Sequence, residues 1–275
     1  MSRVWLVTGA NSGFGRAITE AAVAAGDTVV AAVRRPASLD DLVAQHPDQV
    51  DPVRLDVTDS EQAAGVAADV LARHGRIDVL VNNAGRTHVG ALEETTDDEL
   101  RALFDVHVFG PAALVRAVLP HMRERRTGAI VQLSSMGGQL SFAGFGAYSG
   151  TKFALEGMSE ALADEVAPYG IKVLIVEPGS FRTGLFSAGT TSEETGPYAD
   201  TVGTTRRMIE SSDGKQPGDP AKAAAAILTA LAAEETPLRL PLGDDAVDAV
   251  LGHLERVRTE VESWETVARD TAIEG

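Results

Sequence analysis

The sequence predicts a doubly wound, mostly parallel α/β sheet that forms a single domain over residues 1–275. Short, nearly continuous apolar runs alternate with amphipathic helical stretches through the first two thirds of the chain. Strands covered on both faces have such runs, and repeated strand, helix and strand units force parallel pairing with right-handed crossovers. A glycine-rich turn between the first run and the first helical stretch is also typical of this fold class.

Six segments have the composition of buried strands, namely residues 3–8, 28–33, 52–55, 78–81, 129–133 and 172–176. Helices with recognisable ends lie between them. The sequence TDSE at 58–61 has the spacing of a capping box and predicts a helix that ends at Gly75. TDDE at 96–99 predicts the start of another helix, and a third begins near Tyr148 and ends at 168–170.

The segment from about 184 to 220 interrupts this order. It is rich in Thr, Ser and Gly and carries only a weak helical pattern at 205–209. A long stretch of this kind inside a domain is typical of a functional lid or of a disordered insertion, and we expect a substrate loop here.

The end of the chain has further helical patterns. Residues 220–233 predict a helix, residues 238–242 a short strand, and residues 246–267 an amphipathic helix within a C-terminal tail of about 244–275. Eleven acids and four bases fall in residues 234–275. The tail is either a packing or oligomer element or a helix with a solvated face.

Composition excludes several classes of partner. The chain has 24 Lys and Arg against 40 Asp and Glu, a net charge of −16, which repels nucleic acid and anionic membrane surfaces. It has no cysteine, and its six histidines lack metal-ligand spacing, so we expect no metal site. The opening MSRVWLVTG lacks the pattern of a signal peptide, so we expect a cytoplasmic location.

The turn TGANSGFG at residues 8–15 predicts a nucleotide-binding loop. Glycines allow a tight turn and a close approach of the backbone to a pyrophosphate, and the helix N-terminus supplies free N–H donors and a positive dipole end. An unoccupied glycine turn is the alternative. The candidate cofactor-binding residues here are Thr8, Gly9, Asn11, Ser12, Gly13, Phe14 and Gly15.

The ends of the second and third strands suggest which nucleotide binds. A free ribose 2′-hydroxyl is usually bound by a carboxylate at the end of the second strand, whereas a 2′-phosphate needs a cation. This chain has Arg34 and Arg35 there, which favours NADP(H) over NAD(H), unless the two arginines only form a solvated turn. Asp56, followed by Val57, is placed to accept from an adenine amino group or to form a turn.

Tyr148 and Lys152 are the candidate catalytic pair. Their spacing places the phenol and the ammonium on one face of a helix, and the preceding strand ends at Ser135. Forming tyrosinate at pH 7 costs about 4 kcal/mol, and a cation about 4 Å away contributes a similar amount at an effective dielectric of 20. We therefore expect Lys152 to make Tyr148 a usable acid or base, with Ser135 polarising a carbonyl oxygen. A surface pair is the alternative.

These residues and two further motifs resemble one family. The turn at 8–15, NNAG at 82–85, Ser135, Tyr148-x-x-x-Lys152 and Pro178-Gly179-x-x-x-Thr183 have the order and spacing of the short-chain dehydrogenases/reductases, in the branch with a single Rossmann-fold domain. The segments PHMRERRTGAIV and YSGTKFALEG resemble its hydroxysteroid-dehydrogenase-like bacterial members. The resemblance implies cofactor contacts for Asn83, Ala84, Gly85, Tyr148, Lys152, Pro178, Gly179 and Thr183. It also implies assembly as a homodimer or homotetramer through the helix carrying Tyr148 and the neighbouring helix.

One position departs from the family pattern. His107 stands where the family usually has an asparagine that helps to hold a water in the proton relay to the lysine. His107 either keeps this water through its backbone carbonyl, joins the relay through its imidazole, or packs as a helical histidine.

We therefore expect an NADP(H)-dependent oxidoreductase that interconverts a secondary alcohol and a ketone, with a small molecule as substrate. The alternatives are an epimerase or dehydratase with tightly held nicotinamide, and a non-catalytic nucleotide-sensing protein. Residues near the expected site either bind an apolar or aromatic ketone or close the core. They are Phe142, Phe145, Leu185, Phe186, His88 and Val89.

Overall fold

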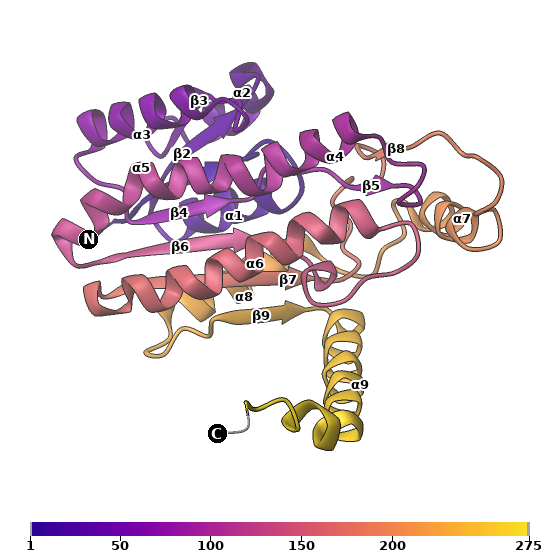
Figure 1. Ribbon diagram of the computed structural model, residues 1–275. Coiled ribbons are helices and arrows are strands. Elements are labelled where there is room, and N and C mark those ends of the chain that lie inside the picture. Colours follow the sequence, from indigo (N-terminus) through magenta and orange to yellow (C-terminus); the bar gives the residue numbers. More distant parts are fainter. Residues whose placement is uncertain (1, 274–275) are drawn as a thin grey trace.

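A computed structural model describes residues 2–273 and contains a parallel seven-stranded sheet (Figure 1). The strand order is β3-β2-β1-β4-β6-β7-β9. Successive strands are added on one side of β1 up to β3, and from β4 onward they are added on the other side. This change of side is the topological switch point at which open α/β sheets bind ligands. The predicted doubly wound fold is confirmed. The strands are β1 (Val4–Thr8), β2 (Thr28–Val33), β3 (Val50–Arg54), β4 (Val79–Asn82), β6 (Gly128–Leu133), β7 (Ile171–Pro178) and β9 (Arg239–Leu242).

Helices cover both faces of the sheet (Figure 1). Alternate residues of β1 separate the two layers, because Trp5 and Val7 belong to one buried cluster and Val4 and Leu6 to the other. The first cluster packs against α1 (Gly13–Ala24), α2 (Asp40–Gln45) and α8 (Pro220–Ala232). The second packs against α3 (Ser60–His74), α5 (Gly110–Arg125) and α6 (Gly146–Val166).

One predicted capping box is confirmed and the other is wrong. The Thr96 hydroxyl accepts from the Glu99 N–H at the start of α4 (Asp97–Phe104), and the Glu99 carboxylate accepts from the Thr96 N–H, as a capping box requires. At α3 the cap is Asp59 instead of Thr58, because the Thr58 N–H and hydroxyl both donate to Asp56 Oδ1.

A π-helical turn, Asp105–Phe109, joins α4 to α5. The Gly110 N–H donates to the Asp105 carbonyl five residues earlier, and a Cβ at Gly110 would lie 2.5 Å from the Val57 carbonyl oxygen. Together the three elements form a helix over 97–125 that is long and apolar enough to cross a membrane, but half of its most apolar window is buried inside the domain. Packing in the core therefore accounts for its composition.

The remaining elements lie around the carboxyl edge of the sheet and beyond β9. β5 (His88–Val89) pairs with β8 (Thr190–Thr191), next to α7 (Val202–Ser212), which is longer than the helical pattern of the sequence suggests. α9 (Asp244–Arg269) follows β9 and projects from the domain (Figure 1). Single turns of 3₁₀-helix occur at Pro36–Leu39, Met136–Gly138 and Ala167–Tyr169.

Candidate active site

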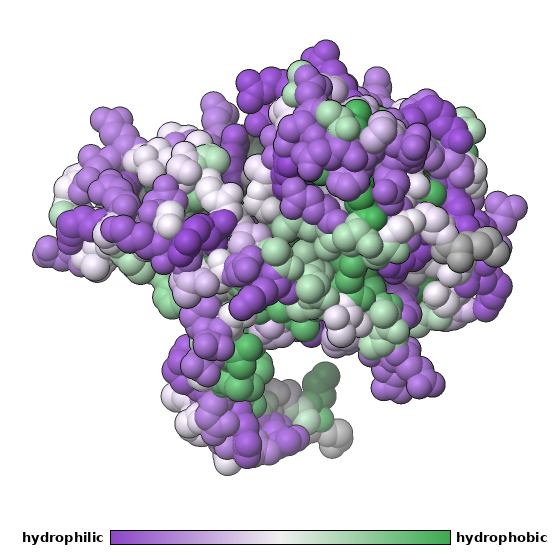
Figure 2. Space-filling model, turned by 180° about the vertical axis from the view of Figure 1, so that it is seen from behind, coloured by the Kyte–Doolittle hydropathy of each residue, from purple (hydrophilic) through white to green (hydrophobic). Residues whose placement is uncertain are grey.

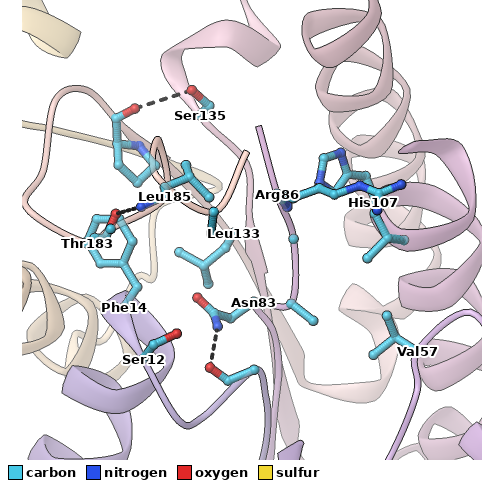
Figure 3. A pocket seen from close by; sticks show the side chains of 18 of the residues that line it. Ser12, Phe14, Val57, Asn83, Arg86, His107, Leu133, Ser135, Thr183 and Leu185 are labelled. Carbon is cyan, nitrogen blue, oxygen red and sulfur yellow. Dashed lines mark hydrogen bonds between the residues drawn. The ribbon is translucent and has the colours of Figure 1, made fainter. Parts of the chain in front are cut away.

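A pocket of about 680 Å³ opens at the carboxyl ends of the central strands. Ser135, Thr183 and Leu185 lie on one side of it, and His107 and Arg86 lie on the other (Figure 3). Of the residues predicted for the site, the pocket is lined by Gly9, Asn11, Ser12, Gly13, Phe14, Arg34, Asp56, Val57, Asn83, Ala84, Gly85, His107, Ser135, Tyr148, Lys152, Pro178, Gly179 and Thr183.

Thr8 and Gly15 belong to the frame of the pocket and do not line it. The Thr8 hydroxyl accepts the N–H groups of Asn83 and Ala84 at 2.9 and 3.0 Å and donates to the Val81 carbonyl, so it ties β1 to β4. A Cβ at position 15 would lie 2.2 Å from the Gly9 carbonyl oxygen. Gly15 therefore allows α1 to start directly against the turn.

The glycine turn is built to receive an anion. Gly9 and Gly13 have φ values of +64° and +51°, which L side chains rarely adopt. Ser12 occupies the N-cap of α1 without making a side-chain cap bond, unlike the caps of α3, α4 and α8. The first N–H groups of α1 thus face the pocket, where a pyrophosphate would be bound by the helix N-terminus.

An exposed cation, Arg34, lines the pocket directly after β2. Among the described residues, Arg34 makes no ion pair, although its charge helps to lower the pKa of Asp56. The larger causes of that shift are the hydrogen bonds from the Thr58 N–H and hydroxyl to the Asp56 carboxylate, at 3.1 and 2.8 Å. Arg34 is therefore available to a ligand phosphate.

Ser135, Tyr148 and Lys152 lie close together in the lining of the pocket. Tyr148 and Lys152 lie one turn apart on α6, and Ser135 follows β6. The Lys152 ammonium donates to the Leu133 carbonyl at 2.8 Å, and Ser135 Oγ accepts the Gly137 N–H at 3.0 Å. The three groups can therefore polarise and protonate one substrate oxygen.

Burial controls the titration of this pair in the protein alone. Desolvation raises the pKa of Tyr148 to about 12, and the nearby Ser135 hydroxyl only partly offsets it. Desolvation lowers the pKa of Lys152 to about 8, against the opposing charge of Glu156. The expectation that Lys152 lowers the tyrosine pKa does not describe the protein alone, because loss of hydration has the larger effect.

His107 lies on the π turn beside Tyr148, with the two rings edge to face at 5.6 Å. Its Nε2 accepts the Arg86 N–H at 3.2 Å, and its Nδ1 lies 2.8 Å from Thr151 Oγ1. The Thr151 hydroxyl donates to the Tyr148 carbonyl, so it accepts from His107. His107 is therefore assigned the tautomer that is protonated at Nδ1, and this N–H donates to Thr151 Oγ1. Burial, with the charges of Lys152 and Arg86, holds the pKa of His107 well below its ordinary value.

The loop after β7 closes the pocket against the glycine turn. A Cβ at Gly13 would lie 3.0 Å from the Thr183 Cβ, and the rings of Phe14 and Phe181 pack at 5.1 Å. The Ser180 N–H donates to Asp245 Oδ2 at 2.7 Å, so the start of α9 supports this loop.

The predicted substrate residues separate into two groups. Leu185 and Phe186 line the pocket, whereas Phe142, Phe145, His88 and Val89 do not. His88 is buried and lies 2.8 and 2.9 Å from the Thr190 and Ser192 hydroxyls. Val89 and Phe145 pack with Val202 of α7. His88, Val89 and Phe145 therefore contribute contacts between residues 190–202 and the rest of the domain.

A buried ion pair connects α7 to the rest of the domain. Glu94 accepts from the N–H groups of Thr195 and Ala91 and from Arg206 Nη2, at 2.9, 3.0 and 2.9 Å. These bonds lower the pKa of Glu94 to about 2. Because Arg206 belongs to α7, the pair connects this helix to the segment that follows β5.

Sequence reasoning missed several pocket residues. Arg86 directly follows the NNAG motif, and this position was the only available signal for it. Thr190 and Gln216 come from the segment 184–220, where the sequence has no motif. Within residues 2–273, no group of three or more acids and histidines is placed to hold a metal ion.

Comparisons with known proteins agree with this geometry. A family model described as short chain dehydrogenase matches residues 3–194. Oxidoreductase BOA17 of Botryotinia fuckeliana is 37% identical over 277 residues, covering 99% of this chain and 100% of that protein. 3-Ketodihydrosphingosine reductase of Bacteroides thetaiotaomicron is 37% identical over 244 residues, covering 88% of each chain.

Solved structures share the fold. A short-chain dehydrogenase from Streptomyces avermitilis has a TM-score of 0.94 at 66% identity and covers 98% of both chains. A short-chain dehydrogenase/reductase from Burkholderia phymatum in complex with NAD has a TM-score of 0.83 at 25% identity, over 96% of this chain and 95% of that one. A short chain dehydrogenase from Burkholderia cenocepacia in complex with NADP has a TM-score of 0.71 at 25% identity, over 100% and 98%. With its nucleotide pocket and its matching motifs, the chain belongs to the short-chain dehydrogenase/reductase family of oxidoreductases.

Proposed function

We propose that this protein is an NADP(H)-dependent oxidoreductase that interconverts a secondary alcohol and a ketone. The observation that carries the proposal is the meeting of the Ser135 hydroxyl, the Tyr148 phenol and the Lys152 ammonium in a pocket that begins at a glycine turn. When bound, the nicotinamide would supply the hydride in reduction or accept it in oxidation.

The chain's own groups would handle the proton. In reduction, Tyr148 donates its phenolic proton to the carbonyl oxygen of the ketone, and Ser135 donates a hydrogen bond to the same oxygen. A tyrosine with a pKa of about 12 holds this proton at neutral pH, so it is available as the acid. Lys152 stabilises the tyrosinate that remains, because a positive charge nearby favours the anion.

Arg34 supports NADP(H) as the cofactor. It is an exposed cation that lines the pocket next to Asp56 and makes no ion pair in the described part of the chain. A guanidinium can bind a phosphate through two hydrogen bonds. Ser12, Asn83 and Thr183 also line the pocket beside the glycine turn, where they would contact the other parts of the dinucleotide.

The substrate is a small apolar ketone or alcohol. Leu185 and Phe186 present apolar side chains to the pocket from the segment that follows β7. The Bacteroides relative is named as a reductase of a 3-keto compound, which agrees with chemistry at a carbonyl group.

Tyr148→Phe tests the proposal. A series of ketones is supplied with NADPH, and the loss of nicotinamide absorbance is measured for the wild type and the variant. We expect turnover to fall by about 10²-fold to 10⁴-fold, while calorimetry gives an NADPH dissociation constant within about twofold of the wild type. Full turnover in the variant, or no dinucleotide binding by folded wild-type protein, would overturn the proposal.

A further inference from the structure

Most residues of α9 are exposed to solvent. Ala246 and Val250 are buried where the helix leaves β9, whereas every residue from Leu254 to Arg269 is exposed. Figure 1 shows α9 pointing away from the edge of the sheet, and Figure 2 shows it from behind as a projection with hydrophobic side chains beside hydrophilic ones. The part of this 26-residue helix from Leu254 onward thus extends into solvent.

The exposed part of α9 has a regular apolar face. Leu254, Val257, Val261 and Trp264 follow each other at spacings of three and four residues, and each is between 40% and 66% exposed. This spacing continues to Ala268. Apolar residues that repeat every 3.5 residues on average form the seam of a left-handed coiled coil.

The charge of α9 argues against a lipid surface as the occupant of this face. The helix carries seven Asp and Glu and three Arg between Asp244 and Arg269, so an anionic membrane repels it. Its polar flanks instead fit a protein helix, because coiled-coil partners are selected by charges next to the apolar seam.

The charges beside the seam on one copy of α9 are complementary to those on a second, antiparallel copy. Arg258 and Glu265 lie seven residues apart at equivalent positions beside the seam, and Glu260 lies on its other side. Parallel pairing would place Glu260 against Glu265 of a second copy, which is repulsive. Antiparallel pairing with Val261 against Trp264 of the second copy places each Arg258 against the other copy's Glu265, so both attractive pairs form at once.

We propose that α9 pairs with α9 of a second copy of this chain as an antiparallel coiled coil centred between Val261 and Trp264. The two copies of Val250, where the helices leave their bodies, are then 25 residues apart along the pair, or about 37 Å. The pairing is separate from the pocket, whose lining includes no residue of α9.

Sedimentation equilibrium of charge-reversal variants tests the pairing. We expect Val261→Glu to halve the mass of the wild-type assembly at the same concentration, because it places two acids in the seam. Arg258→Glu and Glu265→Arg each weaken association by about tenfold, and the double variant restores it. Glu255→Arg, an equal charge change on the far side of the helix, leaves the mass unchanged and serves as the control.

Trp264 gives a second measurement in the same samples. It is 66% exposed in one copy, whereas Trp5 is fully buried, so only Trp264 changes its environment on pairing. We expect its emission to shift to the blue as concentration rises, and Trp264→Phe removes the shift. An assembly unaffected by Val261→Glu, a failure of the double variant to restore association, or Trp264 that is shielded only by added lipid vesicles would overturn the proposal.

Discussion

The Lys152 ammonium lies 5.7 Å from the centre of the Tyr148 ring. Burial acts on the two groups in opposite directions, since it raises the pKa of the phenol to about 12 and lowers that of the ammonium to about 8. At neutral pH the protein alone therefore holds a neutral tyrosine beside a charged lysine. This state suits donation of a proton to a substrate oxygen.

The buried lysine predicts a pH-dependent stability. In the unfolded chain Lys152 keeps its proton up to its ordinary pKa of 10.5, whereas the folded protein releases it near pH 8. The unfolded state binds more protons between these values, so the free energy of unfolding rises with pH there. We expect a rise on the order of 2 kcal/mol between pH 8 and 9.5 in urea denaturation, and its loss in Lys152→Met.

Lys222→Met is the matched control, because it removes an exposed lysine and should keep the rise. An equal rise in Lys152→Met and the wild type would show that another group is responsible.

Arg34→Asp should change the preference for the cofactor. A carboxylate repels a 2′-phosphate and accepts from a 2′-hydroxyl, so we expect the ratio of NADH to NADPH dissociation constants to fall by about 10-fold to 100-fold. Calorimetry with both nucleotides measures this ratio. Arg35→Asp makes the same charge change at a residue that does not line the pocket. If the two variants behave alike, general charge explains the preference.

His107 should act as a neutral positioning residue. Replacing it by Ala leaves the Arg86 N–H and Thr151 without their partner, and we expect the free energy of unfolding to fall by about 2–4 kcal/mol. Because the pKa of His107 is far below its ordinary value, kcat/KM of the wild type should show no step from this residue between pH 5.5 and 7.5. A nitrogen-15 NMR spectrum with a charged His107 in this range would contradict this assignment.

The ion pair between Arg206 and Glu94 should hold α7 in place. In Arg206→Met we expect limited proteolysis within 190–212 to be about tenfold faster, because Glu94 loses its cation and α7 loses its ion pair with the segment after β5. Arg207→Met removes an exposed arginine of the same helix and should be cleaved at the wild-type rate. Equal rates for both variants would show that other contacts hold α7.

Much of the site could be predicted because its signals are local. The glycine turn, Ser135 and the four-residue spacing of Tyr148 and Lys152 each depend on a short stretch next to a strand or helix end. Parallel strands bring such ends to one edge of a sheet, so the order of the motifs was enough to place them together. The cap of α3 was predicted one residue early because Asp56 competes for Thr58.

The sequence by itself determined the alternation of strands and helices and the glycine turn, and it singled out Ser135, Tyr148 and Lys152 as the candidate catalytic groups, since periodicity and spacing encode these features. The tertiary structure alone decided which partners the buried groups have. His107 contacts Thr151, 44 residues away in the sequence, and His88 contacts Ser192, 104 residues away. These contacts show that both histidines hydrogen-bond to other segments of the protein. It also decided the direction of the Tyr148 pKa shift, because desolvation depends on every segment that packs around the phenol.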